Sequence, residues 1–192
     1  MENNIIEKRN INGEFRALED GRTVEGYAIV FNSESRDLGG FVEIIEPSAV
    51  DNEVIGTSDV FALLNHERER GILARSKYGK GSLKLDIDEH GLKYTFETPK
   101  TALGDELLEY LKRGDITTSS FCFCVENDKW ERLNDGSYKR TISKIKSLHD
   151  VSPVYCEAYA ATTVNKRGME DLMAKEMEDL TDYYNELKKQ IG

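Results

Sequence analysis

The order of apolar and polar residues predicts a chain built mainly from β-strands. Residues 24–31 (VEGYAIVF) and 41–45 (FVEII) are rich in the branched and aromatic residues that strands favour. Residues 82–88 and 92–98 alternate apolar and polar side chains, as half-buried strands do, and the intervening Glu89-His90-Gly91 predicts a tight hairpin turn. The other expected strands are residues 59–64, 72–76, 116–125, 138–145 and 148–155.

One clear helix interrupts this pattern at residues 102–113. Its leucines are spaced three and four residues apart, which places them on one face of a helix. Thr101 is the expected N-cap, and Gly114 is the expected first residue past the C-terminus. A shorter helical turn is expected in the stretch EPSAVDNEV (46–54), with Ser48 as its candidate N-cap.

The pattern changes near residue 165, so we divide the chain into a domain over 1–164 and a helical tail over 165–192. Apolar residues of the tail recur at spacings of four and three; they are Met173, Met177, Leu180, Tyr184, Leu187 and Ile191. This spacing is typical of a coiled coil of about three heptads that joins copies of the protein or a partner. An amphipathic helix packed on its own domain explains the same spacing, and the sequence leaves both interpretations open.

A β-dominated chain with one inserted helix is typical of a β-barrel, or of a strongly bent sheet with helices packed outside it. The predicted fold class is therefore mainly β with helices (α+β), followed by the C-terminal helical tail. The length of 192 residues suits one such domain with a short appendage.

Composition and charge exclude several functions. The net charge is −10, and affinity for nucleic acid depends on clustered Lys and Arg, so unaided nucleic-acid binding is not expected. No stretch approaches the roughly 18 uncharged apolar residues of a membrane span, and the first ten residues contain no apolar signal core, so a membrane or secreted protein is not expected. Three cysteines without a CxxC spacing indicate reduced thiols rather than a disulfide framework or a zinc site.

The strand expected at 116–125 presents two different faces. Its aromatic side chains share one face with Ser119, whereas Ser120, Cys122 and Cys124 point to the other. The Ser120 hydroxyl is a candidate nucleophile if a histidine approaches it. Small side chains that simply fit beneath a neighbouring helix are the alternative interpretation, and the strand alone favours this alternative.

Three histidines are candidates for a general base, because the pKa of imidazole lies near neutrality. His90 falls in the expected hairpin turn and is most simply a solvated loop residue. His66 follows an apolar strand in the sequence LLNHE, which suits a residue at the rim of a core. His149 stands beside Asp150 at the start of the last expected strand.

Passages along the chain resemble the prohead (capsid-maturation) serine proteases of tailed bacteriophages, which are related in fold to the herpesvirus assemblins. In order they are EGYA with VFN (25–32), EIIEPSAV (43–50), LNHE with ILAR (64–75), GDITTSSFCF (114–123) and LHDVSPV (148–154), followed by Ala158-Tyr159. The resemblance covers roughly residues 14–164, and the order and spacing of the passages make it specific.

By this resemblance His66 is the general base, Ser120 the nucleophile and Asp150 the acidic third member of a triad. Ser120 is preferred over Ser119 because it directly precedes the phenylalanine of the family's serine-phenylalanine passage. Assemblins use a second histidine as third member, which makes His149 the alternative to Asp150. In a regular strand these two side chains face opposite sides, so only one reaches His66, and a carboxylate is the commoner orienting group.

The resemblance implies an assemblin-like β-barrel and a serine endopeptidase that cleaves scaffolding protein, scaffold-like segments of the major capsid protein, and itself during head maturation. It implies a homo-oligomer inside the assembling prohead, in the cytoplasm of the bacterial host, and no metal or cofactor.

Two alternatives to this interpretation stay open. One is a cysteine nucleophile, Cys122 or Cys124, on the face of Ser120. The other is a non-catalytic capsid-assembly scaffold that uses the barrel and the coiled-coil tail for protein interaction.

Overall fold

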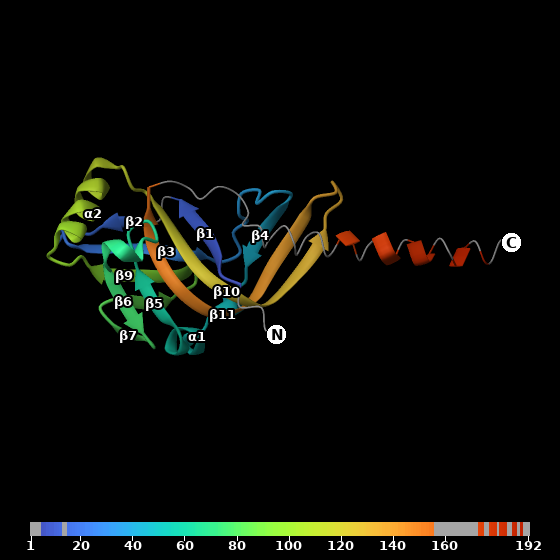
Figure 1. Ribbon diagram of the computed structural model, residues 1–192, viewed down its shortest axis with the longest axis horizontal. Helices are drawn as coiled ribbons and strands as arrows, with labels where there is room; N and C mark the ends of the chain where they lie inside the picture. The colour runs from blue at the N-terminus through green and yellow to red at the C-terminus, as the bar shows by residue number, and fades with distance from the viewer. Residues whose placement is uncertain are drawn as a thin grey trace.

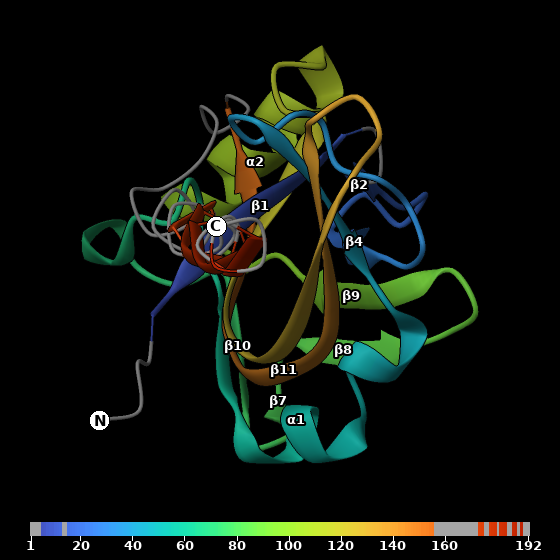
Figure 2. The same cartoon turned by 90° about the vertical axis from the view of Figure 1, so that its right-hand side faces the viewer.

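The fold is organised around one long antiparallel hairpin of two strands, β10 (Thr118–Arg132) and β11 (Tyr138–Val154). The computed structural model describes residues 5–12, 15–155, 173–174, 177–179, 181–183, 186–187 and 189. β10 and β11 run side by side and curve together, as Figures 1 and 2 show. Register shifts in their ladder contribute to this curvature, because each β-bulge bends its strand and increases the local twist.

Five further strands complete a seven-stranded sheet on this hairpin. In order the strands are β1 (Glu7–Asn12), β10, β11, β5 (Asp59–Ala62), β6 (Ala74–Lys77) and β7 (Lys80–Gly81), and β4 (Phe41–Ile45) also pairs with β11. β1 is antiparallel to β10, whereas β4 and β5 run parallel to β11. β4 pairs with the first part of β11 and β5 with its last part, so β11 connects the two halves of the sheet.

A second sheet has four antiparallel strands. In order they are β2 (Phe15–Ala17), β3 (Thr23–Val30), β9 (Gly91–Glu97) and β8 (Lys84–Ile87). β8 and β9 form the hairpin predicted around His90, and the Asp88 N–H closes its turn on the Gly91 carbonyl (3.0 Å). The mainly β fold with helices is confirmed. Among the described residues no strand pair joins the two sheets, so backbone hydrogen bonds do not close the expected barrel.

Short helices connect the strands. They are η1 (Pro47–Ala49), α1 (Asn52–Thr57), η2 (Arg68–Arg70) and α2 (Ala102–Arg113). α2 has the predicted bounds: the Thr101 side chain accepts the capping hydrogen bond, and Gly114 follows in the left-handed conformation with a φ of 77°. The expectation for Ser48 is wrong, because the Asp51 side chain accepts from the Val54 N–H (2.9 Å) and caps α1 instead.

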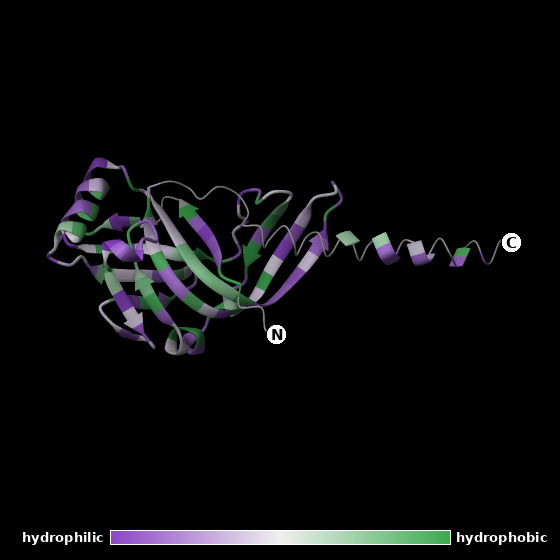
Figure 3. Ribbon diagram, viewed as in Figure 1, coloured by the Kyte–Doolittle hydropathy of each residue, from purple (hydrophilic) through white to green (hydrophobic). Residues whose placement is uncertain are grey.

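Both sheets and α2 contribute to one hydrophobic core. Tyr94 of β9 and Phe121 of β10 are among its largest fully buried side chains. Leu107 of α2 is fully buried, and the other leucines of this helix pack against the same cluster, as their spacing predicts. Hydrophobic and hydrophilic residues alternate along many of the strands (Figure 3), which is the pattern of strands with one buried face.

A buried cluster of charged residues links β1, β4 and β11. This charge network consists of Glu7, Arg9, Glu43 and Arg140, whose exposed fractions lie between 3% and 7%. Arg9 donates two hydrogen bonds of 2.6 Å to Glu43 and one of 2.7 Å to Glu7. Arg140 donates to Glu7 at 2.6 and 3.0 Å and to Glu43 at 3.0 Å. Burial opposes ionisation of Glu7, but the hydrogen bonds and charges of both arginines outweigh it and lower the pKa of this carboxyl.

The tail is described only in part. The boundary expected at residue 165 lies outside the described residues, and so do three of the six apolar residues of the predicted seam, so the division into two domains stays a prediction. Met173 and Met177 lie in helical segments and are 40% and 67% exposed. Within the described part of the chain, no helix has the length and apolar character needed to cross a membrane.

The charge network predicts that Arg140→Leu strongly destabilises the fold. The substitution leaves Glu7 and Glu43 buried with one arginine between them, and breaking a buried ion pair typically costs about 3–5 kcal/mol. Urea unfolding at neutral pH measures this loss. Arg16→Leu is the matched control, because Arg16 pairs with Glu25 at 2.6 Å on the surface and is 75% exposed; it should cost less than about 1 kcal/mol. Equal losses in the two variants would contradict the prediction.

Candidate functional site

Ser120 lies on β10 with the orientation that the sequence predicts. Its neighbour Phe121 belongs to the core. Ser119 also faces inward, because its Oγ and the Oη of the buried Tyr94 are hydrogen-bonded at 2.6 Å. Ser120 therefore points to the other face of the sheet, where it is 1% exposed and shares this face with Cys122.

A tight turn after β5 positions His66. The Glu67 N–H donates to the Leu64 carbonyl (3.1 Å), and the central residues Asn65 and His66 have φ values of 55° and 62°. Asn and His adopt this left-handed region more readily than most residues. The Asn65 N–H also donates to the Pro153 carbonyl of β11 (2.9 Å), which ties the turn to the long hairpin. Backbone strain of this kind is common at functional sites.

Asp150 lies on β11, directly opposite Cys122 of β10. The ladder then skips His149, which forms a β-bulge. The bulge turns His149 toward the same face as Asp150, contrary to the alternation expected for a regular strand. His149 Nε2 contacts Cys124 Sγ and Ser147 Oγ, each at 3.3 Å. Of the two candidates for the third member, Asp150 is the one hydrogen-bonded to His66.

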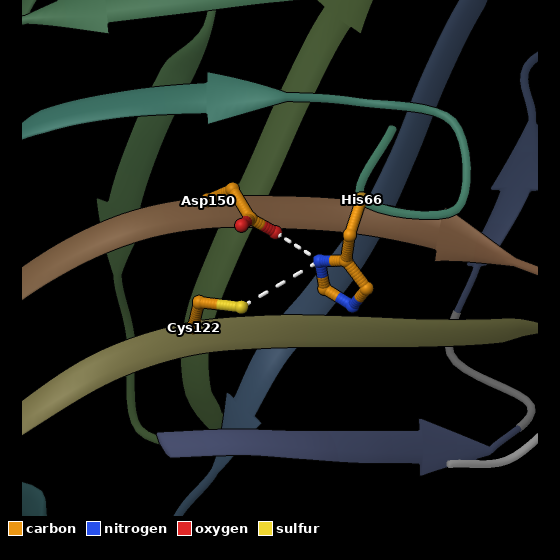
Figure 4. Close-up of side chains that lie close together, drawn as sticks. All are labelled: His66, Cys122 and Asp150. Atoms are coloured by element: carbon orange, nitrogen blue, oxygen red, sulfur yellow. Dashed lines mark hydrogen bonds and ion pairs between the residues drawn. The ribbon is translucent and has the colours of Figure 1, made fainter. Parts of the chain in front are cut away.

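The three predicted site residues form one chain of hydrogen bonds. His66 Nδ1 lies 2.6 Å from Asp150 Oδ1, and His66 Nε2 lies 2.8 Å from Ser120 Oγ. Figure 4 shows the imidazole reaching from the turn after β5 toward Asp150 on β11 and Cys122 on β10. An ionised carboxylate only accepts, so Nδ1 of the neutral ring carries the proton and Nε2 accepts from the Ser120 hydroxyl.

The environment of Asp150 favours its ionised form. Burial raises the pKa of this carboxyl, but the hydrogen bond from His66, the charge of that ring when it is protonated, and hydrogen bonds from Ser152 and Cys122 outweigh burial and lower the pKa below its usual value. The Ser152 hydroxyl, which is fully buried, donates to Asp150 Oδ1 at 2.7 Å. The carboxylate is therefore charged at neutral pH and held from two sides.

Cys122 lies beside the same histidine but in a different electrostatic position. Its Sγ is 3.6 Å from His66 Nδ1, the nitrogen that faces Asp150. Burial raises the pKa of the Cys122 thiol well above its usual value, and the nearby Asp150 charge raises it further. The thiol stays protonated at neutral pH, which disfavours the cysteine alternative at this position, because only the thiolate is strongly nucleophilic.

One contributor to the site, Ser152, was not predicted from the sequence. It stands two residues after Asp150 on the same strand, so both side chains lie on one face. It is also the ladder partner of Ser120. The sequence signal that could have identified Ser152 is a hydroxyl residue two positions after a candidate carboxylate on the same strand.

A hydroxyl, an imidazole and a buried carboxylate in this order are the arrangement of serine hydrolases. The comparison with protein families identifies the kind of hydrolase. The model of the caudovirus prohead serine protease family matches residues 11–177, and the chain belongs to this family. The protein is therefore a serine-type protease of phage capsid maturation, which disfavours the hypothesis of a non-catalytic scaffold.

Among solved structures, the chain resembles the capsid assembly protease of bacteriophage T4, gp21, with a TM-score of 0.44 and 15% sequence identity. This alignment covers 79% of the present chain and 97% of the T4 chain. The comparison with curated proteins found no match.

The Ser152 contact predicts that Ser152→Ala lowers kcat for peptide cleavage by about 10-fold or more, because a hydrogen bond to a charged group is worth about 1.5–3 kcal/mol. Ser152 acts as a positioning residue, so KM should change little. Ser152→Thr keeps the hydroxyl and should restore most of the rate, which a purely structural role would not require. Ser143→Ala is the control, since that hydroxyl on the same strand donates to the Asn127 carbonyl and not to a residue of the site. An unchanged kcat in Ser152→Ala would contradict the prediction.

Proposed function

We propose that this protein is the endopeptidase that cleaves the scaffolding protein, or scaffold-like segments of the major capsid protein, inside the assembling prohead, and that it also cleaves itself. Ser120 is the nucleophile, His66 the general base and Asp150 the orienting carboxylate. The observation that supports these roles best is the hydrogen-bonded chain from Ser120 through His66 to Asp150, at 2.8 and 2.6 Å. Membership in the prohead protease family supports the choice of substrates.

The first half of the reaction forms an acyl-enzyme. Ser120 Oγ attacks the carbonyl carbon of the scissile peptide bond while His66 Nε2 takes the hydroxyl proton. The ring then carries a positive charge, which the ionised Asp150 stabilises across the short bond to Nδ1. Collapse of the tetrahedral intermediate breaks the C–N bond, and His66 Nε2 gives its proton to the leaving amine.

The second half restores the enzyme. Water enters where the amine has left, and His66 Nε2 takes a proton from it as the water attacks the ester carbonyl on Ser120. The ester bond to Ser120 breaks, and the proton returns to Ser120 Oγ. Throughout both halves Asp150 stays ionised and keeps the proton of the resting ring on Nδ1, so that Nε2 is free to accept.

The proposed roles predict that Ser120→Ala abolishes cleavage. Removal of the nucleophile in a triad typically lowers kcat by about 10⁴-fold or more. The test is coexpression of the full-length protein with its phage's capsid and scaffolding proteins, with fragments followed by gel and mass spectrometry. Labelling by a fluorophosphonate probe should occur at Ser120 and disappear in the variant.

The neighbouring serine is the matched control for this test. Ser119→Ala removes the hydrogen-bond partner of the buried Tyr94 hydroxyl, which costs about 1–3 kcal/mol of stability. It leaves Ser120 and His66 in place, so cleavage below the melting temperature should continue at a similar rate. Cleavage that survives in Ser120→Ala, or is lost equally in Ser119→Ala, would contradict the assignment of the nucleophile.

We also propose that residues 165–192 serve association rather than catalysis. The predicted seam and the exposure of Met173 and Met177 support this role.

This seam predicts that Met173→Glu with Met177→Glu lowers the oligomer mass measured by light scattering, because charges in an apolar seam oppose helix association. Glu178→Gln with Asp179→Asn on the same segment is the control and should leave the mass unchanged. An oligomer that resists the methionine substitutions would contradict a role of the tail in association.

A further inference from the structure

Cys122 gives the site a set of donor atoms that peptide hydrolysis does not require. His66 Nδ1, Cys122 Sγ and a carboxylate oxygen of Asp150 all lie within 4.8 Å of one another. In the part of the chain that the structure describes, this is the one group of three such side chains placed so closely. Imidazole nitrogen, thiolate sulfur and carboxylate oxygen are the three ligand types that Zn²⁺ takes from proteins.

We propose that His66, Cys122 and Asp150 form an inhibitory binding site for a thiophilic divalent cation such as Zn²⁺ or Cd²⁺. The cation is an inhibitor here and not a cofactor. The inhibitory effect rests on the proposed function, because it requires His66 to be the general base. The binding itself does not depend on that function.

The spacing of the donor atoms suits a cation of this size. Bonds of about 2.0–2.3 Å in tetrahedral geometry place ligand atoms roughly 3.3–3.8 Å apart. The 3.6 Å between His66 Nδ1 and Cys122 Sγ already falls in this range. The 2.6 Å between His66 Nδ1 and Asp150 Oδ1 is a hydrogen bond, and it must open by about 0.7 Å to admit the metal. Three protein ligands leave the fourth position for water, as in open zinc sites.

Solvent reaches two of the three ligands. The side chains of His66 and Asp150 are 13% and 11% exposed. Cys122, on the neighbouring strand β10 (Figure 4), is only 2% exposed. A hydrated cation therefore meets the imidazole and the carboxylate first and sheds water as it reaches the sulfur.

Cation binding and catalysis exclude each other because they require the proton of the His66 ring on different nitrogens. In the active form Nδ1 of His66 carries a proton that it donates to Asp150. A cation on Nδ1 requires this proton to move to Nε2, and the thiol of Cys122 loses its own proton to solvent. One proton is thus released for each cation bound. Nε2 then donates instead of accepting, and it can no longer take the proton of Ser120, which is the failure expected from the wrong tautomer.

The first experiment measures binding without any need for activity. Full-length Ser120→Ala protein is titrated with Cd²⁺, and the thiolate-to-metal charge-transfer absorption and the proton release are followed. We expect saturation at one cation, with one proton released. Cys122→Ser or Cys122→Ala in the same background should weaken binding by at least about 10-fold, since loss even of an outer-shell partner costs that much. The fold of each variant is checked by circular dichroism.

Cys124→Ser is the matched control. Cys124 stands two residues along the same strand and also touches a histidine, His149, at 3.3 Å. It lies outside the group of three, so its substitution should leave the titration unchanged. Binding that survives both Cys122 variants, or that is lost in Cys124→Ser, would overturn the site.

The second experiment measures inhibition of the enzyme with Ser120 intact. Zn²⁺ should slow peptide cleavage and a chelator should restore it. The concentration for half inhibition, taken relative to the metal-free rate of each variant, should rise at least 10-fold in Cys122→Ser. Binding in the first experiment without inhibition in the second would overturn the inhibitory role alone. Absence of peptidase activity altogether would count against the proposed function, while the first experiment still decides the site.

Discussion

Antiparallel pairing of β10 with β11 puts Ser120 opposite Ser152 and Cys122 opposite Asp150. Side chains of paired residues on one face are about 5 Å apart, so the four polar groups form a compact block. His66 is delivered to this block by β5, which pairs with β11 at Asp150 itself. The site therefore depends on the register of one hairpin, and a slip of one residue would turn Ser120 into the core and Ser119 out of it.

Much of this site follows from sequence patterns, because alternation along a strand is a local property. The two faces of β10 were predicted from the aromatic residues that follow Ser120, and the packing of Tyr94 against Ser119 bears them out. The position of His149 was not predictable in this way. Alternation places it opposite to Asp150, but a bulge shifts the phase by one residue, and a bulge is set by pairing with a distant strand. The contact of His66 with Asp150 likewise joins residues 84 positions apart, which no local pattern encodes.

One of the strands that the sequence pattern did not predict, β1, shows why some strands escape this kind of prediction. Its inward positions carry Glu7 and Arg9, so a search for apolar alternation finds nothing there. Burial of these charges is possible because Glu43 of β4 pairs with Arg9 and Arg140 of β11 pairs with Glu7. The helix α2 is the opposite case: its leucine spacing, cap and terminal glycine all act within a dozen residues, and its bounds were predicted without error.

The position of the carboxylate also decides which side chain on β10 can act as nucleophile. Ser120 meets the imidazole at Nε2, on the far side of the ring from Asp150, so in the proposed mechanism its proton moves onto a base that the carboxylate strengthens. Cys122 meets the ring at Nδ1 and lies next to Asp150, whose negative charge opposes formation of a thiolate and raises the thiol pKa. The Asp150 charge therefore favours proton loss from Ser120 but opposes it at Cys122, two residues further along the strand. A divalent cation reverses the effect at Cys122, because it supplies the positive charge that a thiolate beside Asp150 lacks.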